Sequence, residues 1–161
     1  MQNKNALKIT QAAMIAAVYV VLTIMVNAFG MASGPVQIRL SEALTILPYF
    51  TPAAVPGLFI GCLISNLITG CLPWDVVLGS IATLLGALGT RALRKYKWLA
   101  PLPPIVSNTL IIPLVLHYIY NAPGALPFYA GTVFVGELIS AGALGMVLLF
   151  TLSPYRERLF K

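Results

Sequence analysis

Glu137 is the residue whose position most directly points to chemistry. It lies in an apolar run, residues 127–152, that contains no other charged side chain and is long enough to cross a bilayer as one helix. An ionised carboxylate near the middle of such a helix costs about 2.5 to 3.5 kcal/mol on insertion scales, so ionisable groups at this depth usually serve a function. The sequence therefore predicts that Glu137 binds a ligand or a partner side chain.

Further side chains have the chemistry to join Glu137 in one binding site. Carboxylate, amide and guanidinium groups exchange hydrogen bonds with a polar ligand, and an indole ring stacks on a flat one. The candidates are Arg39, Glu42, Asn66, Trp74, Asp75 and His117. The alternative is that they pair with one another, for example Arg39 with Glu42 or Asp75. For Trp74 the alternative is an aromatic belt at the membrane boundary.

The composition identifies the class of protein that must position these residues. Hydrophobic residues make up 59% of the chain and charged residues 9%, which lies far outside the range of soluble domains. We therefore predict an all-α integral membrane protein. The 161 residues leave room for one bundle of helices, so we expect a single membrane domain over residues 1–161.

Six apolar runs predict the helices of this bundle. Five of them read as full spans, and the second is short because Pro48 and Pro52 interrupt it; proline donates no backbone hydrogen bond and disfavours helix just before it. The runs are residues 9–29, 43–49, 53–69, 76–88, 105–120 and 128–152. The prediction is a bundle of six transmembrane helices with a short second helix.

The basic residues predict the orientation of the bundle. They precede the first span and follow the fourth and the sixth: Lys4, Lys8, Arg91, Arg94, Lys95, Lys97, Arg156, Arg158 and Lys161. The positive-inside rule places such clusters in the cytoplasm, so we expect both termini to be cytoplasmic. This placement accounts for the formal net charge of +6 without a nucleic-acid partner.

The predicted topology brings the unusual polar side chains to a similar depth. The last span runs inward from about residue 129, which places Glu137 roughly 12 Å below its outer end at 1.5 Å per residue. Asn66 and His117 fall in the outer halves of spans that run outward, and Asp75 opens the fourth span. A water-accessible pocket that opens outward satisfies all of these groups. We therefore predict a binding site in the outer half of the bundle.

The first span also carries a stripe of small residues that favours close helix packing. Ala12 and Ala16, and likewise Ala13 and Ala17, are four residues apart, which leaves a smooth surface on which another helix packs closely. Two interpretations stay open: the stripe packs inside the bundle, or it docks a partner subunit.

The sequence contains no motif of catalysis or of metal binding. It has no H-E-x-x-H, G-x-S-x-G or nucleotide-binding P-loop sequence. His117 is a single histidine, and Cys62 and Cys71 are too few and too ill-spaced for a metal site. We therefore expect a protein that is not an enzyme, that holds no metal or cofactor, and that needs ions or a partner ATPase to move a solute uphill.

Four stretches of the sequence carry a family resemblance. They are VQIRLSEALTILPYFTPAAVPGLFIGCLISNL (residues 36–67), WDVVLGSIATLLGALGT (74–90), PLPPIVSNTLI (101–111) and VGELISAGALG (135–145). They resemble the QueT family, the queuosine-precursor substrate-binding S components of energy-coupling factor (ECF) transporters. The resemblance implies a six-helix subunit in a prokaryotic-type cell membrane, which associates with an ECF transmembrane coupling subunit and two ATPase subunits that use the ATP. It also implies that the alanine stripe docks the coupling subunit and that residues 30–41 form a lid over the ligand.

The ligand implied by the resemblance is a 7-deazaguanine, which presents two adjacent N–H donors on one edge. A carboxylate accepts both donors in a forked pair, and we expect Glu137 to do so because it lies deepest. A second carboxylate, Asp75 with Glu42 in reserve, neutralises the amine of an aminomethyl form. The other implied contacts are two amides for the polar atoms of the ring and one ring for stacking: Asn66, Asn108 and Trp74.

The sequence leaves several alternatives open. The ligand is the aminomethyl form (preQ1), the nitrile (preQ0) or queuine, and the roles of the carboxylates are interchangeable. A rival from another class is a self-sufficient proton-coupled carrier in which Glu137 is the relay and His117 its partner. A second rival is a structural membrane subunit without a ligand.

Overall fold

The computed structural model describes residues 4–30 and 38–160, and these residues contain helices and no β-strand. Short 3-10 helices (η1, η2, η5) and π-helical segments (η3, η4) connect or extend the α-helices. In chain order the elements are α1 (Lys4–Ala28), η1 (Leu40–Tyr49), α2 (Ala54–Ile68), α3 (Pro73–Ala92), η2 (Lys97–Leu99), α4 (Leu102–Leu114), η3 (Val115–Ile119), α5 (Leu126–Glu137), η4 (Leu138–Leu144), α6 (Gly145–Leu152), η5 (Ser153–Tyr155) and α7 (Arg156–Leu159).

The described elements form six consecutive helical segments, because η2, α4 and η3 make up one long segment and α5 to α7 make up another. Four segments are long and apolar enough to cross a membrane, namely Asn5–Ala28, Pro73–Ala92, Lys97–Ile119 and Leu126–Leu159. The predicted all-α, six-helix membrane protein is therefore confirmed. The third segment is shorter than predicted: α2 has 15 residues, whereas a span needs about 20. Pro52 precedes it, and Gly70, with a positive φ of 75°, follows it.

The predicted short second helix is η1, and it packs in the middle of the bundle. It contacts α1, α3, α6 and η4, and both Glu42 and Ile46 are only 1% exposed. Pro48 lies inside η1 and removes one backbone donor, which a short 3-10 helix tolerates better than a long α-helix. The interior position of η1 carries a glutamate into the centre of the molecule.

The two ends of η1 have different surroundings. After its C-terminal end, the ring of Phe50 stacks on Phe160 from the end of the chain, with centroids 5.1 Å apart and an interplanar angle of 8°. Leu44, Ile46 and Leu47 of η1 belong to the buried hydrophobic core. At its N-terminal end, Ser41 and Glu42 are buried polar residues. The apolar core and the polar residues are thus separated along η1.

Two glycines bring α2 close to α1. A Cβ atom on Gly57 would lie 2.7 Å from the carbonyl oxygen of Ala12, and one on Gly61 would lie 2.9 Å from Cβ of Tyr19. These distances are shorter than van der Waals contact between heavy atoms, about 3.5 to 4.0 Å for carbon pairs, so only glycine permits this approach. The same Cβ atom on Gly61 would lie 3.1 Å from the Cα atom of Ala16. Two alanines of the predicted small-residue stripe therefore face α2.

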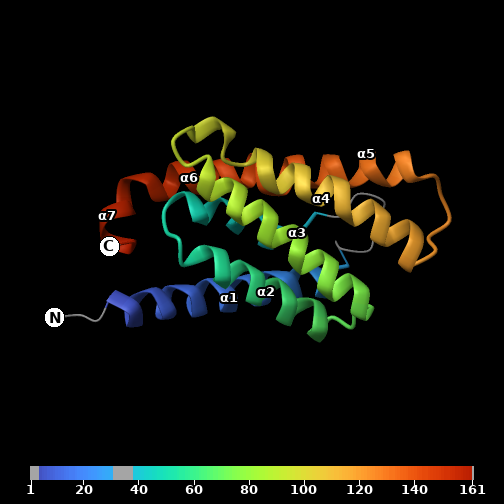
Figure 1. Cartoon of the computed structure of the whole chain (residues 1–161), viewed down its shortest axis with the longest axis horizontal. Coiled ribbons are helices and arrows are strands. Elements are labelled where there is room, and N and C mark those ends of the chain that lie inside the picture. Colours follow the sequence, from blue (N-terminus) through green and yellow to red (C-terminus); the bar gives the residue numbers. More distant parts are fainter. Residues whose placement is uncertain (1–3, 31–37, 161) are drawn as a thin grey trace.

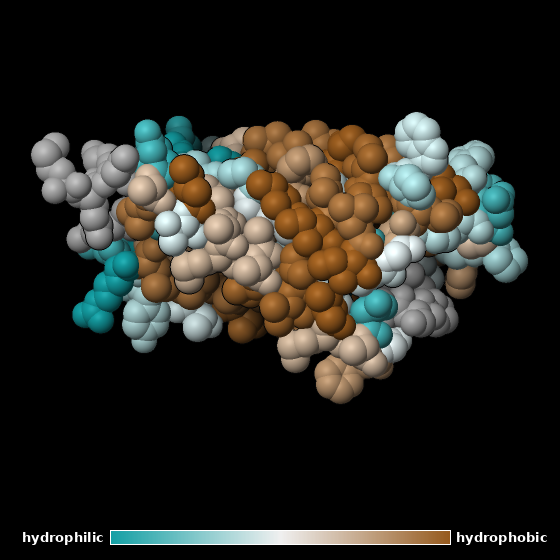
Figure 2. Space-filling model, turned by 90° about the horizontal axis from the view of Figure 1, so that it is seen from below, coloured by the Kyte–Doolittle hydropathy of each residue, from teal (hydrophilic) through white to brown (hydrophobic). Residues whose placement is uncertain are grey.

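The two ends of the described chain lie at the same end of the bundle. Figure 1 shows the start of α1 beside α7, while the α2–α3 and η3–α5 connections lie at the opposite end. Figure 2 shows an apolar band across the middle of one face, between two more hydrophilic ends. This is the surface of a multi-pass membrane protein, since side chains that face lipid are apolar. The cytoplasmic location of the termini stays a prediction.

Candidate functional site

A polar cavity of about 390 Å³ lies at the end of the bundle opposite the termini. The last turns of α1, α2 and η3 and the first turn of α3 surround it, together with residues at the start of η1. Its lining residues are Thr23, Val26, Asn27, Arg39, Ser41, Asn66, Thr69, Cys71, Asp75, Ile112, Val115, Leu116, Tyr120 and Ala122. The volume falls within the range of small-molecule sites, roughly 300 to 1,000 Å³, and a few polar groups on an apolar background are typical of them.

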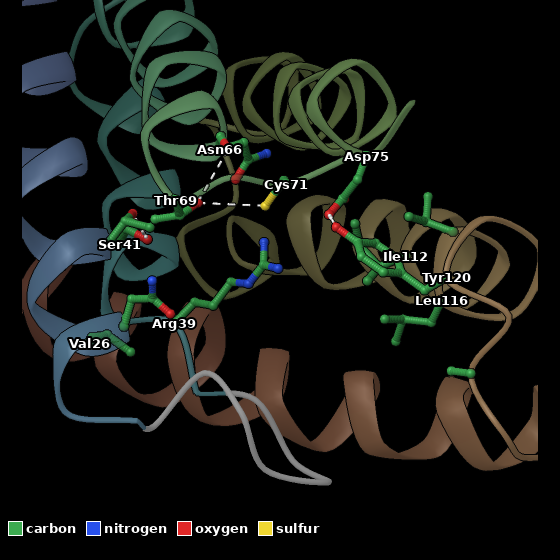
Figure 3. A pocket seen from close by; sticks show the side chains of 14 residues that line it. Val26, Arg39, Ser41, Asn66, Thr69, Cys71, Asp75, Ile112, Leu116 and Tyr120 are labelled. Carbon is green, nitrogen blue, oxygen red and sulfur yellow. Dashed lines mark hydrogen bonds between the residues drawn. The ribbon is translucent and has the colours of Figure 1, made fainter. Parts of the chain in front are cut away.

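Three of the predicted site residues line this cavity directly. Figure 3 shows Arg39 reaching into its middle, with Asn66 and Asp75 on the facing wall. The guanidinium group of Arg39 makes no hydrogen bond or ion pair with any residue that the structure describes, while its backbone N–H donates to Oγ of Ser140 at 3.1 Å. Among the described residues, the amide nitrogen of Asn66 has only the sulfur of Cys62 as an acceptor, at 3.6 Å. Polar donors of both side chains are therefore available to a ligand.

Asp75 is held in place by a tyrosine from another helix. It lies in the first turn of α3 and is 7% exposed. The hydroxyl of Tyr120, at the end of η3, donates to Oδ2 of Asp75 at 2.7 Å and accepts from the backbone N–H of Leu72 at 3.2 Å. A carboxylate near a helix N-terminus is also stabilised by the helix dipole. The contacts fix one oxygen of Asp75 and leave Oδ1 for another partner.

A network of buried side chains lies next to the cavity. Tyr19 of α1 donates to Oε1 of Glu42. Asn108 of α4 donates through Nδ2 to Oε2 of Glu42 at 3.3 Å and to Oε1 of Glu137 at 2.9 Å. We call Tyr19, Glu42, Asn108 and Glu137 the carboxylate network. It adjoins the cavity because Tyr19 and Asn108 lie one helical turn before the lining residues Thr23 and Ile112.

The two carboxylates of this network are close enough to repel each other strongly. Oε2 of Glu42 and Oε1 of Glu137 share one amide nitrogen, so they are within roughly 6 Å of each other, a distance at which two unit charges repel by about 3 kcal/mol at an effective dielectric constant of ~20. Arg39 is the one cation among the residues lining the cavity, and it attracts both carboxylates electrostatically. The network thus places two acidic side chains near a single cation.

One oxygen of Glu137 has no partner. Its Oε2 atom is buried and accepts no hydrogen bond from the described residues, although buried polar atoms in native proteins are nearly always paired. Glu137 is the last residue of α5, and the π-helical segment η4 follows it directly. Such π-helical turns are frequent at functional sites. Oε2 of Glu137 is therefore a buried acceptor that no described residue satisfies.

Trp74 and His117 are not brought to the cavity. Trp74 is 67% exposed and points away from the lining, although its neighbour Asp75 points into it. The ring of His117 packs edge to face on Tyr118, with centroids 4.8 Å apart, and its Nδ1 atom is buried without a partner among the described residues. Neither side chain is in position to touch a molecule in the polar cavity.

Sequence reasoning missed two tyrosines of the site. Tyr19 lies in an apolar run and is 2% exposed, and no local signal indicates that its hydroxyl meets a glutamate 23 residues further on. Tyr120, which was not among the predicted site residues, orients Asp75. The sequence feature that could have identified Tyr120 is its position near the predicted outer end of a span, at the same depth as the other candidate residues.

The small-residue stripe of α1 is divided between two surfaces. Ala12 and Ala16 face α2, whereas Ala13 and Ala17 are exposed. A second groove, of about 540 Å³, lies beside them between α1 and the start of α2. We call it the α1–α2 groove, and it is lined by Lys8, Ile9, Ala12, Ala13, Ala16, Pro52, Ala53, Pro56 and Ile60.

Residues 31–37 of the predicted lid, which was placed at residues 30–41, lie outside the described residues. Of the remaining lid residues, Arg39 and Ser41 line the polar cavity.

Comparison with known proteins supports the resemblance seen in the sequence. The family model described as the QueT transporter matches residues 9–154. Over 99 residues the chain is 32% identical to the queuosine precursor transporter QueT of Lactococcus lactis subsp. cremoris (strain MG1363), a match that covers 60% of this chain and 57% of the relative. The chain thus spans less than two thirds of that relative's length. No solved structure matches the chain. Because the family model covers most of its length, the chain belongs to the QueT transporter family.

Proposed function

We propose that this chain is the substrate-binding membrane subunit of an ECF-type importer. It captures a queuosine precursor of the 7-deazaguanine class at the outer face of the cell membrane, and partner subunits drive uptake with ATP. Family membership and the name of the Lactococcus relative support this proposal. The observation that carries it is the unpaired, buried oxygen of Glu137 beside a polar cavity of about 390 Å³.

Glu137 is assigned to the guanine-like edge of the ligand. That edge presents two adjacent N–H donors, and a carboxylate accepts two donors in a charge-assisted forked pair. Asn108 takes one lone pair of Oε1, so Oε2 and a second lone pair of Oε1 remain. Glu137 does not itself line the cavity, so the contact requires its side chain to rotate toward the ligand. The hydrogen bond from Asn108 to Oε1 restricts how far the Glu137 side chain can rotate, and so it fixes the direction in which the carboxylate faces.

The lining residues supply the remaining polar contacts. A 7-deazaguanine has a carbonyl oxygen beside its N–H edge, and this oxygen needs a donor. The guanidinium group of Arg39 and the amide of Asn66 both offer donors at the cavity wall. Burying the carbonyl without such a donor costs about 1 to 3 kcal/mol. These two residues therefore contribute to affinity through the ring rather than through the 7-substituent.

The exposed part of the small-residue stripe is assigned to partner docking. Ala13 and Ala17 present small side chains on α1, and the apolar α1–α2 groove lies next to them. A helix of an ECF coupling subunit packs closely on such a surface. The ATPase subunits then act through the coupling subunit, and this chain binds without catalysing a reaction.

The test of this proposal is ligand binding to the purified chain. We expect 7-deazaguanines to bind and to raise the thermal midpoint of unfolding in detergent, because a ligand that binds only the folded state stabilises it. Guanosine, whose ribose sits on the ring, is the control for size and is expected not to bind. Absence of binding and of stabilisation with every 7-deazaguanine would support a structural subunit instead.

A further inference from the structure

The site holds more carboxylates than a neutral base uses. Three of the four acidic residues of the chain, Glu42, Asp75 and Glu137, lie in the carboxylate network or at the cavity wall. Each of the three is at most 7% exposed. Arg39 is the one cation in the cavity lining, and it offsets a single negative charge. Three buried acidic side chains are thus gathered near one cation.

The hydrogen bonds show which carboxylates have capacity left. Each oxygen of Glu42 already accepts one hydrogen bond, from Tyr19 and from Asn108. Glu137 keeps Oε2 without a partner, and no described residue donates a hydrogen bond to Oδ1 of Asp75. Glu42 is thus a fixed part of the scaffold. Two carboxylates, Glu137 and Asp75, are left to meet a ligand.

These two carboxylates lie at different depths. Asp75 is in the first turn of α3, at the end of the bundle where α5 begins. Glu137 is the last residue of α5, 12 residues in length, which places it roughly 16 Å along that helix from its start. A ligand that meets both carboxylates must therefore be elongated and carry donors at its two opposite ends.

A 7-deazaguanine with an amine on its 7-substituent has this form. The N–H edge lies on the six-membered ring, and the 7-substituent projects from the other end of the bicycle. With the edge at Glu137, the amine comes to the outer part of the cavity, where Asp75 and Tyr120 lie. A larger group on the amine nitrogen then points toward the mouth of the cavity rather than into the packed core.

We infer that the site selects positively charged 7-deazaguanines, whose 7-substituent carries an ammonium group, over neutral ones such as the nitrile. The inference rests on the proposed function and adds the charge of the ligand to it. An ammonium group forms a charge-assisted hydrogen bond with Oδ1 of Asp75, to which no described residue donates. A neutral ligand desolvates the same carboxylate without replacing its water, and an unpaired buried charge is strongly unfavourable.

Three ligands of matched shape test this inference by calorimetry on the purified chain. They are 7-aminomethyl-, 7-methyl- and 7-cyano-7-deazaguanine. We expect the aminomethyl compound to bind at least about 30-fold more tightly than the methyl compound, which differs from it in lacking the ammonium group. The cyano compound, which is also neutral, is expected to bind no better than the methyl compound within about threefold.

Two variants then test whether Asp75 recognises the amine. In Asp75→Asn we expect the preference for aminomethyl over methyl to fall to about threefold or less, since the carboxylate charge is gone. Tyr120→Phe, which removes the hydroxyl that orients Asp75, keeps all charges and is expected to reduce the preference by a smaller factor. Glu157→Gln, an exposed carboxylate near the termini, is the matched control and keeps the preference of the wild type.

The possible results separate this inference from the proposed function. Equal binding of the aminomethyl and methyl compounds would overturn the inference and leave the proposed function intact. A preference that survives in both Asp75→Asn and Tyr120→Phe would also overturn it, because the amine is then recognised elsewhere. If no 7-deazaguanine binds to the wild type, the proposed function itself fails.

Discussion

The amide nitrogen of Asn108 donates a hydrogen bond of 2.9 Å to Oε1 of Glu137. The bond orients the carboxylate of Glu137 but leaves its other oxygen buried without a partner. The same nitrogen also donates to Glu42, so one amide holds two neighbouring carboxylates. The position of both carboxylates therefore depends on this one side chain.

Replacing Asn108 by leucine tests how much this shared amide contributes to stability. The variant leaves two buried carboxylates without their common donor, and we expect it to lower the free energy of unfolding by about 2 to 4 kcal/mol. The readout is the thermal midpoint in detergent. Adding Glu137→Gln to Asn108→Leu is expected to restore part of the loss, because it removes one of the two charges. Ser107→Ala, next to Asn108 and half-buried, is the control. An additive loss in the double variant would contradict the coupling of the two residues.

Gly61→Ala tests the close packing of α1 on α2. The added Cβ would lie 2.9 Å from Cβ of Tyr19, so the helices must separate, at a cost of about 1 to 3 kcal/mol. We expect a lower thermal midpoint and weaker ligand binding, because Tyr19 holds Glu42 in the network. Gly131→Ala is the matched control. A Cβ there meets no atom within 4 Å, and alanine favours a helix by up to about 1 kcal/mol over glycine. Equal midpoints for the two variants would contradict the packing argument.

Tyr120→Phe tests the position of Asp75 without changing any charge. The lost hydrogen bond of 2.7 Å frees the carboxylate to adopt other rotamers, and we expect binding of an amine-bearing ligand to weaken roughly 3- to 10-fold. Tyr118→Phe is the control, since Tyr118 is 69% exposed and does not line the cavity. If the two variants bind the ligand equally well, the Tyr120 hydroxyl has no part in recognition.

Larger side chains on the exposed face of α1 test partner docking. Ala13→Leu and Ala17→Leu fill a surface on which a partner helix needs small residues, and we expect the coupling subunit and the ATPases to co-purify at a tenth or less of the wild-type yield, an effect of about 1.4 kcal/mol or more. Val21→Leu, an exposed position of α1 outside the stripe, is the control. Cellular uptake is measured in parallel. Uptake that persists after deletion of the ATPase subunits would favour a self-sufficient proton-coupled carrier.

The bundle could be predicted from the sequence because the bilayer restricts what a chain can do. Backbone polar groups in lipid must be satisfied within helices, so the apolar runs and the prolines were enough to predict six segments and a short second one. The bounds of α2 agree with the predicted run to one residue at each end, but its 15 residues are fewer than the roughly 20 of a full span, as which the run was counted.

The depth of a polar side chain in the bundle could be predicted more reliably than the direction in which it points. Asn66 and Asp75 were predicted at the same end of the bundle, and both line the cavity at the end opposite the termini. Trp74 is adjacent to Asp75, but successive residues of a helix point about 100° apart, and which of them faces inward depends on how α3 packs. The role of Tyr19 depends on η1, a 3-10 helix whose place in the bundle no local pattern indicates.

Calorimetry of Glu137→Gln beside the wild type tests the central claim most directly. Glutamine keeps the size of the side chain but replaces one carboxylate oxygen by a donor, so it cannot accept both N–H groups of the guanine-like edge. With 7-aminomethyl-7-deazaguanine as the ligand, we predict binding at least about 30-fold weaker than wild type, while Glu157→Gln binds like wild type. Binding of Glu137→Gln as tight as that of the wild type would contradict the assignment of Glu137 to the ligand.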